Sequence, residues 1–516
     1  MDSTAATPPL GGITASLTWT NVVRLIGLWI LYRVLLCIYN VSPFHPLYRF
    51  PGPRLAAMSF WYEAWYDFFL FGRYTHGIQR MHEKYGPIVR INPEELHCND
   101  PSFIDEIYPS VSSRIRDRHY HFTNALAGAI EKSTFGTRDH ETHRARRAAV
   151  SRFFSRQQML RLEPEVHELA QKLCDKLLLW AGRGPILMIH PFNCFTADTI
   201  SQYAYGEKLG FLDQDDWLPN FKAAYEAFSQ TVYLFRFIPL LRSLVGLSPY
   251  MADYMGDDIA RWMKQMNVII PGYIRKAQQD RAKGRIFNEL LESSLPESEK
   301  SIFRLSGEGI SLMSAGTETT AATLCVITYY LLANPKAHSR LVNDLKGEDP
   351  RSLSWVALEK YPYLYGTIWE GIRLSYGVST RLARIPRNEQ LRYEKNGYQY
   401  VVPKGTPIGM SSYISHHNEE VFPNSHEFAP ERWINSDGSK NTALEQNILS
   451  FSKGSRQCAG MNLALCELFL VTASLALRVM PRMKLYETTI EDVTYDHETM
   501  TPHIKKGAAG VRVTIT

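Results

Sequence analysis

The sequence predicts a mainly helical α+β protein: a single large helical domain with small β-sheets, preceded by an N-terminal transmembrane helix. Three observations predict this class. Residues 17–39 are predominantly apolar, although they contain Arg24 and Arg33, and amphipathic runs with helical spacing then dominate the chain up to residue 385. Short β-prone stretches come later, in "YQYVVPKGTPIGM" and in the C-terminal "AAGVRVTIT".

Composition limits the classes of protein to consider. The chain has 516 residues, of which 45% are hydrophobic, so it can bury a large core. Its formal net charge of +5 comes from 57 basic and 52 acidic residues, a balance that argues against a nucleic-acid partner. The seven cysteines are scattered, with neither a CxxC pair nor a zinc-ligand spacing, so we expect reduced thiols that face a cytosolic environment.

The N-terminal apolar segment predicts the location of the protein. "LTWTNVVRLIGLWILYRVLLCIY" is as long as the about 20 residues that cross a bilayer. It lacks the basic start and the small-residue cleavage site of a secretory signal, so we expect it to be retained. We assign residues 1–16 to a luminal tail and residues 17–40 to the anchor. Arg49 and Arg54 follow the anchor and favour a cytosolic position for the rest of the chain.

A proline-rich linker over residues 41–54 comes next, and its prolines predict a semi-rigid spacer between the membrane and the body. We assign residues 55–516 to one catalytic domain. Near its start we expect two short strands, Ile88 to Ile91 and Leu96 to Cys98, around an Asn-Pro turn.

The stretch "FSKGSRQCAG", residues 451–460, has the form F-x-x-G-x-R-x-C-x-G. A cysteine thiolate that binds a metal needs nearby N–H groups, positive charge and often a helix N-terminus. Two glycines, Arg456 and the helical run "MNLALCELFLVTASLALRV" after Cys458 supply these features. Phe451 can cover the sulfur, and Arg456 can pair with a carboxylate. The alternative is a structural cysteine in a loop.

The stretch "AGTETT", Ala315 to Thr320, lies inside a long helical run. Glu318 and Thr319 place an acid and an alcohol side by side in the sequence, two groups that can hold or transfer a proton. The Thr319 hydroxyl can reach back to the carbonyl of Ala315, beside the helix-weakening Gly316. The alternative is a buried helix whose threonine is satisfied by its own backbone.

Two further motifs contain possible ion pairs. Glu370 and Arg373 in "EGIR" share one helix face, where an exposed pair would contribute only about 0.2–0.5 kcal/mol. A buried pair would need another partner, and Arg432 in "FAPERW" can supply it. His143 and Arg147 share a face of the basic run "RDHETHRARRAAVSRFFS", for which a solvated helix face is the simpler alternative.

In their order and spacing along the chain, these motifs resemble those of the cytochrome P-450 superfamily, and the resemblance covers residues 55–516. The resemblance implies the cytochrome P-450 fold with haem b as cofactor and Cys458 as the axial thiolate ligand of its iron. It implies that Glu318 and Thr319 are catalytic, through proton relay. Many relatives carry tryptophan where His143 stands. The implied haem-binding residues are Cys458, Arg456, Phe451, Gly454, His143, Arg147 and Arg384, the last from "STRLARIPR". The implied structural triad is Glu370, Arg373 and Arg432, and the implied substrate-pocket residues are Leu312, Ala315, Val378 and Met500.

The anchor and segments such as "WYEAWYDFFLFGRY" resemble microsomal fungal members of secondary metabolism, including the trichodiene oxygenase type. The resemblance implies a single-pass protein of the endoplasmic reticulum membrane that hydroxylates, epoxidises or repeatedly oxidises a lipophilic terpenoid with O₂ and NADPH. A polyketide or an alkaloid is the alternative substrate. The implied partners are NADPH-cytochrome P-450 reductase with its FAD and FMN, cytochrome b5 and membrane lipid. A reductase-independent isomerase or dehydratase, and a non-catalytic haem protein, are the rival classes.

Overall fold

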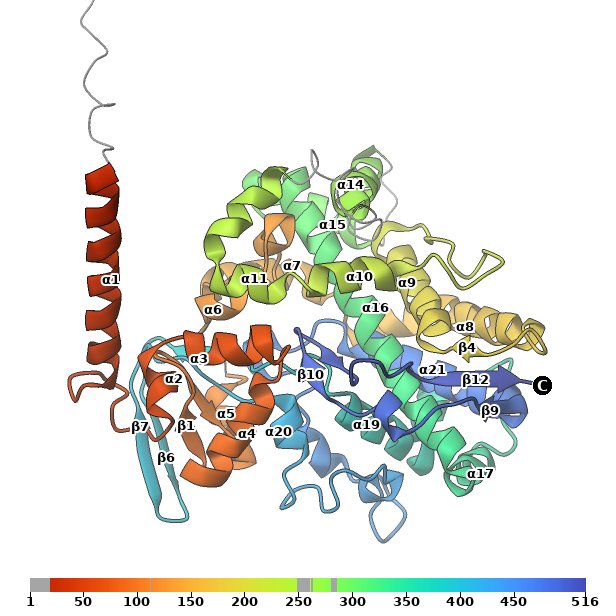
Figure 1. The fold of residues 1–516 in the computed structure, drawn as a ribbon. Helices are drawn as coiled ribbons and strands as arrows, with labels where there is room; N and C mark the ends of the chain where they lie inside the picture. The colour runs from red at the N-terminus through yellow and green to blue at the C-terminus, as the bar shows by residue number, and fades with distance from the viewer. Residues whose placement is uncertain (1–18, 112, 248–259, 261–262, 280–284) are drawn as a thin grey trace, which may run out of the picture.

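The structure, a computed structural model, describes residues 19–111, 113–247, 260, 263–279 and 285–516. In this part of the chain a helix-rich body carries four small sheets, and α1 (Trp19–Val41) projects from one side of the body (Figure 1). The predicted mainly helical fold with small sheets is confirmed.

The helix α1 is long and apolar enough to cross a membrane, and its apolar side chains are exposed. It overlaps the predicted anchor at residues 17–40, whereas the predicted luminal tail at residues 1–16 lies outside the described residues. Two other helices are comparably apolar, α16 (Ile302–Ala333) and α21 (Met461–Arg478), but 61% and 72% of their apolar windows are buried inside the body. Burial explains the apolar composition of both.

The segment after α1 packs against the body. Leu47 and Phe50 are buried in a core cluster next to the sheet. The Arg90 backbone N–H donates to Pro51 O at 2.7 Å, and its guanidinium donates to Asn40 O at 2.8 Å. The two hydrogen bonds of Arg90 and the burial of Leu47 and Phe50 therefore hold the end of α1 against the first strand.

The core forms around α16. This helix begins with a side-chain cap, in which the Ser301 hydroxyl accepts from the Arg304 N–H. It packs against α9 (Ile189–Tyr205), α19 (Pro362–Ser375) and α21, and α21 packs in turn against α8 (Arg156–Leu179). Because neighbours surround it, most side chains of α16 are buried, whichever way they point.

Further helices of the described chain pack around this core or in the smaller clusters near the largest sheet. They are α2 (Arg54–Met58), α3 (Trp61–Ala64), the π-helical η1 (Trp65–Phe69), α4 (Tyr74–Tyr85), α5 (Ile104–Ile107), α6 (Tyr120–Thr123), α7 (His140–Ser151), α10 (Phe221–Ser229), α11 (Val232–Phe237), η4 (Pro239–Leu247), α14 (Ile270–Gln279), α15 (Ile286–Glu292), α17 (Pro335–Asp344), α18 (Trp355–Leu358) and α20 (Ser412–His416).

The largest sheet has the order β1-β2-β8-β5-β3. Its strands are β1 (Ile88–Arg90), β2 (Leu96–Cys98), β8 (Ile408–Gly409), β5 (Arg384–Pro386) and β3 (Arg116–Arg118). The first two pair antiparallel around the predicted turn, with Val89 opposite His97. The other sheets contain β4 (Ile186–Leu187), β12 (Arg512–Ile515) and β9 (Met483–Leu485); β6 (Leu391–Lys395) and β7 (Tyr398–Val402); and β10 (His497–Glu498) and β11 (Pro502–His503). The predicted strands in "YQYVVPKGTPIGM" and "AAGVRVTIT" correspond to β7, β8 and β12.

Candidate active site

A cavity of about 230 Å³ lies between α16 and the loop that contains Cys458. Side chains of α7, of the loop after α19 and of the start of α21 complete its wall. Motifs more than 300 residues apart in the sequence therefore meet at one site. The predicted site residues that line it are His143, Arg147, Leu312, Ala315, Thr319, Val378, Phe451, Arg456 and Cys458.

The cysteine loop turns back on itself before α21 begins. Gly454 has a φ of +70°, and a Cβ there would lie 2.6 Å from Pro109 O, so this position requires glycine. The Cys458 N–H then donates to Phe451 O at 2.8 Å. As a result, Cys458 lies just ahead of α21, which begins at Met461. Gly454 shapes the loop but is not among the described residues that line the cavity.

The exposed side of Cys458 belongs to the cavity wall. Burial by the surrounding chain raises the pKa of its thiol, while the Gly460 N–H and the Arg147 guanidinium act in the opposite direction. A cation bound at the sulfur would add to these two effects and favour the thiolate. The loop can therefore offer a sulfur ligand to a metal inside the cavity.

On the opposite wall, α16 presents Leu312, Ala315, Gly316 and Thr319 to the cavity. The Thr319 hydroxyl donates to Ala315 O at 2.8 Å, the backward hydrogen bond that the sequence predicts. This hydroxyl can still accept a hydrogen bond from a molecule in the cavity. Thr319 is thus placed to hold a proton near a ligand bound between the two walls.

The neighbouring acid, Glu318, is not among the residues of the described chain that line the cavity. Its carboxylate accepts from Asn193 Nδ2 at 3.1 Å and pairs with Lys222 Nζ at 3.3 Å. Burial lowers the pKa of Lys222, but Glu318 and Glu226 outweigh burial and raise it. Consecutive helix residues point about 100° apart, so acid and alcohol face different sides of α16. Lys222 was not among the predicted site residues, because its local sequence gives no indication of a partner 96 residues away.

The cavity wall contains four basic side chains, Arg118, His143, Arg147 and Arg456. The pKa of His143 is lowered to about 2 by burial and by the neighbouring arginines, first Arg456. The pKa of Arg456 is lowered to about 9 by burial and then by Arg384. The wall therefore has an excess of positive charge that an anionic ligand would neutralise.

The described hydrogen bonds of Arg456 and Arg118 go to uncharged carbonyl groups, which do not neutralise their positive charge. Arg456 donates to the carbonyls of Thr137 and Arg138, both at 2.7 Å. Arg118 donates to the carbonyl of Phe135, but its buried Nε has no hydrogen-bond partner among the described residues. Sequence analysis missed Arg118. The alternating arginines of "RDR" in β3, which point to one face of a strand, could have indicated it.

Two carboxyl groups also line the cavity, but among the described contacts neither forms an ion pair with the cations named above. Glu308 pairs with Arg304 at 2.7 Å and accepts from the Thr134 N–H at 2.9 Å. Burial raises the pKa of Glu467 well above its ordinary value and so favours its neutral form. A sulfur on one wall, an alcohol on the other and an unneutralised cationic rim fit haem, an iron-binding group with two carboxylates.

Two predicted residues lie behind the wall. Arg384 is not among the described residues that line the cavity, but its Nη2 donates to Ser452 Oγ at 3.1 Å, and Ser452 does line it. Met500 is also absent from the lining, and its carbonyl accepts from the Thr380 N–H at 3.4 Å. Of the four predicted pocket residues, Leu312, Ala315 and Val378 reach the cavity.

The predicted ion-pair triad is brought together: Glu370 and Arg373 are fully buried, and Arg432 is partly buried. Arg373 donates to both oxygens of Glu370, at 2.9 and 2.8 Å, and Arg432 Nε donates to Oε1 at 2.9 Å. The Trp433 indole and the Ala429 N–H add two more hydrogen bonds at 2.9 Å. Burial raises the pKa of Glu370, but Arg373 first and then Arg432 outweigh burial and lower it. This carboxylate is fully satisfied by the protein itself.

Comparisons with known proteins agree with this geometry. The family model described as Cytochrome P450 matches residues 51–479. The curated protein Cytochrome P450 monooxygenase ppzE of Metarhizium majus is 39% identical over 81% of this chain and 92% of its own length. Cytochrome P450 monooxygenase oblB of Cochliobolus heterostrophus is 36% identical over 95% of both chains. Conidiogenone synthase PchP450 of Penicillium rubens is 38% identical over 93% of this chain and 96% of its own.

Proposed function

Because the chain belongs to the cytochrome P450 family of monooxygenases, we propose that it oxidises a terpenoid intermediate of fungal secondary metabolism at the membrane of the endoplasmic reticulum. The reaction is hydroxylation, epoxidation or several successive oxidations of the same substrate. The observation that carries the proposal is the meeting of Cys458, Thr319 and the cationic rim around one cavity.

The family implies haem, and we assign its contacts to the cavity wall. Cys458 would hold the haem iron through its sulfur, and Arg118, Arg147 and Arg456 would neutralise the two propionates. The uncharged imidazole of His143 would donate a hydrogen bond to one of them. Arg384 acts on the same rim through Ser452. When bound, haem supplies the activation of dioxygen.

The protein's own residues would then manage protons and exclude water. Thr319 Oγ1 holds a proton at the cavity, and its hydrogen bond to Ala315 fixes the direction of the hydroxyl. Glu318 lies behind the helix between Asn193 and Lys222, where it can replenish protons from the outer side of α16. Electrons come from NADPH through a reductase that carries FAD and FMN, and cytochrome b5 is a second possible donor.

The apolar part of the cavity supports a lipophilic substrate. Leu312, Ala315 and Val378 offer hydrocarbon surface next to the site of oxidation. The resemblance to the trichodiene oxygenase type favours a terpenoid, and one of the relatives is named as a conidiogenone synthase. A polyketide or an alkaloid would also fit an apolar wall, so the experiment below separates these classes.

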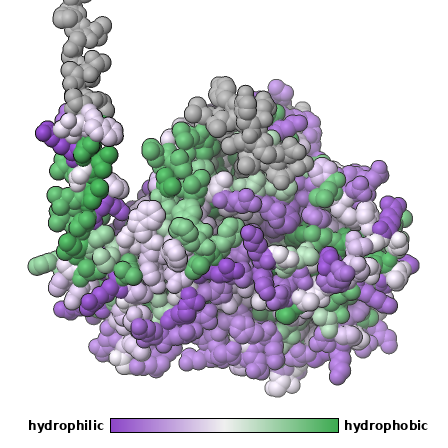
Figure 2. All heavy atoms as spheres, viewed as in Figure 1, coloured by the Kyte–Doolittle hydropathy of each residue, from purple (hydrophilic) through white to green (hydrophobic). Residues whose placement is uncertain are grey.

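Surface hydrophobicity supports the membrane location. Figure 2 shows hydrophobic residues along α1 and over the region of α11 and η4. Leu234, Ile238, Leu240 and Leu244 are exposed there, and Trp61 and Phe69 are exposed on α3 and η1. Together with α1, these side chains are suited to lipid contact.

Part of the positive charge on α7 is already paired within the protein. Arg146 pairs with Glu299 at 2.7 Å, and Arg152 pairs with Glu289. Arg144 is exposed. We therefore propose that Arg144 is the α7 side chain that meets an acidic reductase, because its two neighbours already have partners.

Microsomes that contain the protein and a reductase test the proposed function. They receive extracts of the producing organism with this gene deleted, grown on isotope-labelled mevalonate. We expect a labelled compound to be consumed only when NADPH is present, and to remain in microsomes with the Cys458→Ala variant. Consumption of an unlabelled compound would overturn the terpenoid assignment, and turnover without NADPH and reductase would favour an isomerase or dehydratase.

A further inference from the structure

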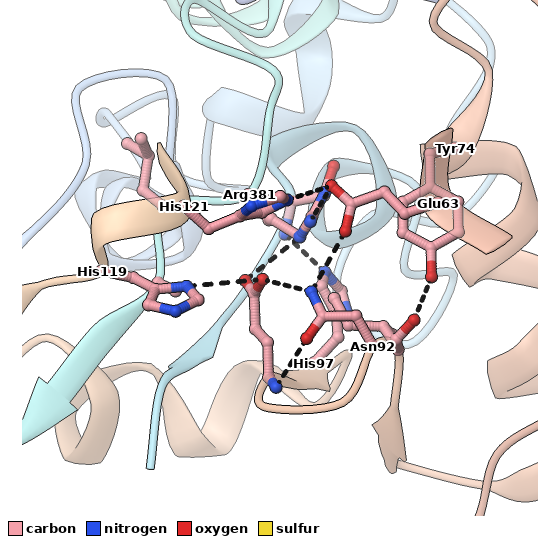
Figure 3. A network of polar contacts seen from close by, with 12 residues as sticks. Glu63, Tyr74, Asn92, His97, His119, His121 and Arg381 are labelled. Atoms are coloured by element: carbon pink, nitrogen blue, oxygen red, sulfur yellow. Dashed lines mark hydrogen bonds and ion pairs between the residues drawn. The ribbon is translucent and has the colours of Figure 1, made fainter. Parts of the chain in front are cut away.

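A second cluster of buried charges lies behind the cavity loop after α19, outside the site described above (Figure 3). Its members come from α3, from the turn between β1 and β2, from α6 and from the loop itself. They are Glu63, Asn92, Glu95, His121 and Arg381, all buried. None of them lines the haem cavity among the described residues.

Glu63 is the junction of this cluster. Its Oε1 accepts from Arg381 Nη2 at 2.6 Å and from His121 Nε2 at 2.9 Å, and its Oε2 accepts from Asn92 Nδ2 at 3.1 Å. Burial raises the pKa of Glu63, but Arg381 and then His121 outweigh burial and hold it well below its ordinary range. Glu63 is therefore an ionised carboxylate with its hydrogen bonds filled.

Arg381 is held from two sides. Besides its bond to Glu63, its Nε donates to Glu95 Oε1 at 3.1 Å, and its guanidinium lies 5.2 Å from the centre of the Tyr74 ring. Two carboxylates from different elements thus fix one side chain in both position and direction. Figure 3 shows Arg381 and His121 converging on Glu63.

The loop that carries Arg381 forms part of the cavity wall. Val378 and Leu382 line the cavity, whereas Arg381, next to Leu382, points to the opposite side. Hydrogen bonds also hold the backbone of this loop: Ser411 Oγ donates to Ser379 O at 3.1 Å, the Thr380 N–H donates to Met500 O at 3.4 Å, and Arg384 Nη1 donates to Leu382 O at 3.0 Å. Among the described side chains of residues 378–382, Arg381 is the one that forms ion pairs. Glu63 and Glu95 therefore fix Arg381, the residue before Leu382, on the side of the loop that faces away from the cavity.

Buried ion pairs do not stabilise a fold better than well-packed apolar side chains, but they fix geometry. We propose that Glu63 and Arg381 are positioning residues that set the shape of the substrate pocket through Val378 and Leu382. The inference rests on the proposed role of this cavity as the oxidation site. Glu63 lies in α3, so a helix near the membrane anchor takes part in defining the pocket.

The test uses the full-length protein in membranes and two variants that change different features of the pair. Arg381→Lys keeps the charge but loses the fork that reaches two carboxylates, and Glu63→Gln keeps the shape but loses the charge. The control is Arg387→Lys, in the exposed pair of Arg387 with Asp117. The probes are 1-phenylimidazole and 4-phenylimidazole, which bind haem iron through nitrogen and differ in shape.

The ratio of the two spectroscopic dissociation constants measures pocket shape. We expect this ratio to change about fivefold or more in both variants, because a misfit of one methylene alone changes discrimination by about tenfold. We also expect faster amide hydrogen exchange over residues 376–384, and neither change in the control. Ratios and exchange that match the unmodified protein would overturn the inference, even if only one of the two variants folds.

The spectrum of the reduced protein with carbon monoxide separates this inference from the proposed function. If the unmodified protein lacks a thiolate spectrum, the proposed function fails, and hydrogen exchange alone decides whether Glu63 and Arg381 fix the loop. If the spectrum is present in every variant and the ratio does not move, only the positioning role fails.

Discussion

Two regions of this molecule bury several charges, and they differ in where the partners of those charges are. Around Glu370, the chain supplies every partner: two arginines, an indole and a backbone N–H surround one carboxylate. Around the cavity, Arg118 and its neighbours are buried without a free carboxylate, and one arginine nitrogen has no partner among the described residues.

The hydrogen-bond partners therefore distinguish a buried charge with a structural role from one that binds a ligand. A buried charge that the chain satisfies needs no ligand, whereas buried cations that the chain leaves unneutralised indicate that an anion belongs there. Burial alone does not distinguish the two regions. The predictions that follow test the contrast, beginning with the largest expected effect.

Glu370→Ala leaves two buried arginines without their carboxylate. We expect a loss of about 3–5 kcal/mol in the free energy of unfolding, enough to prevent accumulation of folded protein. The measurement is the yield of soluble protein with bound haem. The control is Arg340→Ala, which removes an exposed ion pair with Glu431: the two side chains are 52% and 53% accessible to solvent. We expect this variant to lose only about 0–1 kcal/mol in the free energy of unfolding. Equal yields of the two variants would contradict the contrast.

Thr319→Ala removes a hydroxyl from the cavity wall. Its only described bond is to its own helix, so we expect little change in stability but about a hundredfold less product per NADPH. The matched control is Thr199→Ala, whose hydroxyl makes the same backward bond, to Phe195 O at 2.9 Å, in the buried helix α9. Product yields are measured in microsomes with reductase, and an unaffected yield in Thr319→Ala would remove this residue from the proposed mechanism.

Arg118→Met tests the cationic rim directly. Because this cation has no carboxylate partner, we expect the protein produced without haem to melt at a higher temperature, while its affinity for haem falls about tenfold. Arg304→Met is the comparison: both arginines are 5% exposed, but Arg304 pairs with Glu308. It should therefore melt at a lower temperature. If both variants melt at a lower temperature, Arg118 stabilises the haem-free protein as the paired Arg304 does, and the contrast between the two kinds of buried charge fails.

The sequence predicts the parts of this site that depend on short patterns. The turn at Gly454, the bond from Thr319 to Ala315 and the i, i+3 placement of Glu370 and Arg373 each arise within ten residues, so local geometry determines them. The mainly helical class follows for the same reason, because helical spacing is a local property of the chain.

What the sequence does not predict depends on contacts between distant segments. Lys222 meets Glu318 across 96 residues, and Arg381 meets Glu63 across 318. The linker prolines predict a stiff spacer, but the burial of Leu47 and Phe50 against the sheet determines where that segment lies. Such contacts are set by the packing of whole elements, which a single sequence does not specify residue by residue.

The central claim is that Cys458 and the cationic rim form a haem–thiolate site, and one spectrum tests it most directly. The protein is purified, reduced and exposed to carbon monoxide, and its Soret band is compared with that of Cys458→Ala. We predict the strongly red-shifted band of a thiolate-ligated haem in the unmodified protein and its loss in the variant. A variant that keeps the same red-shifted band would contradict the assignment of Cys458.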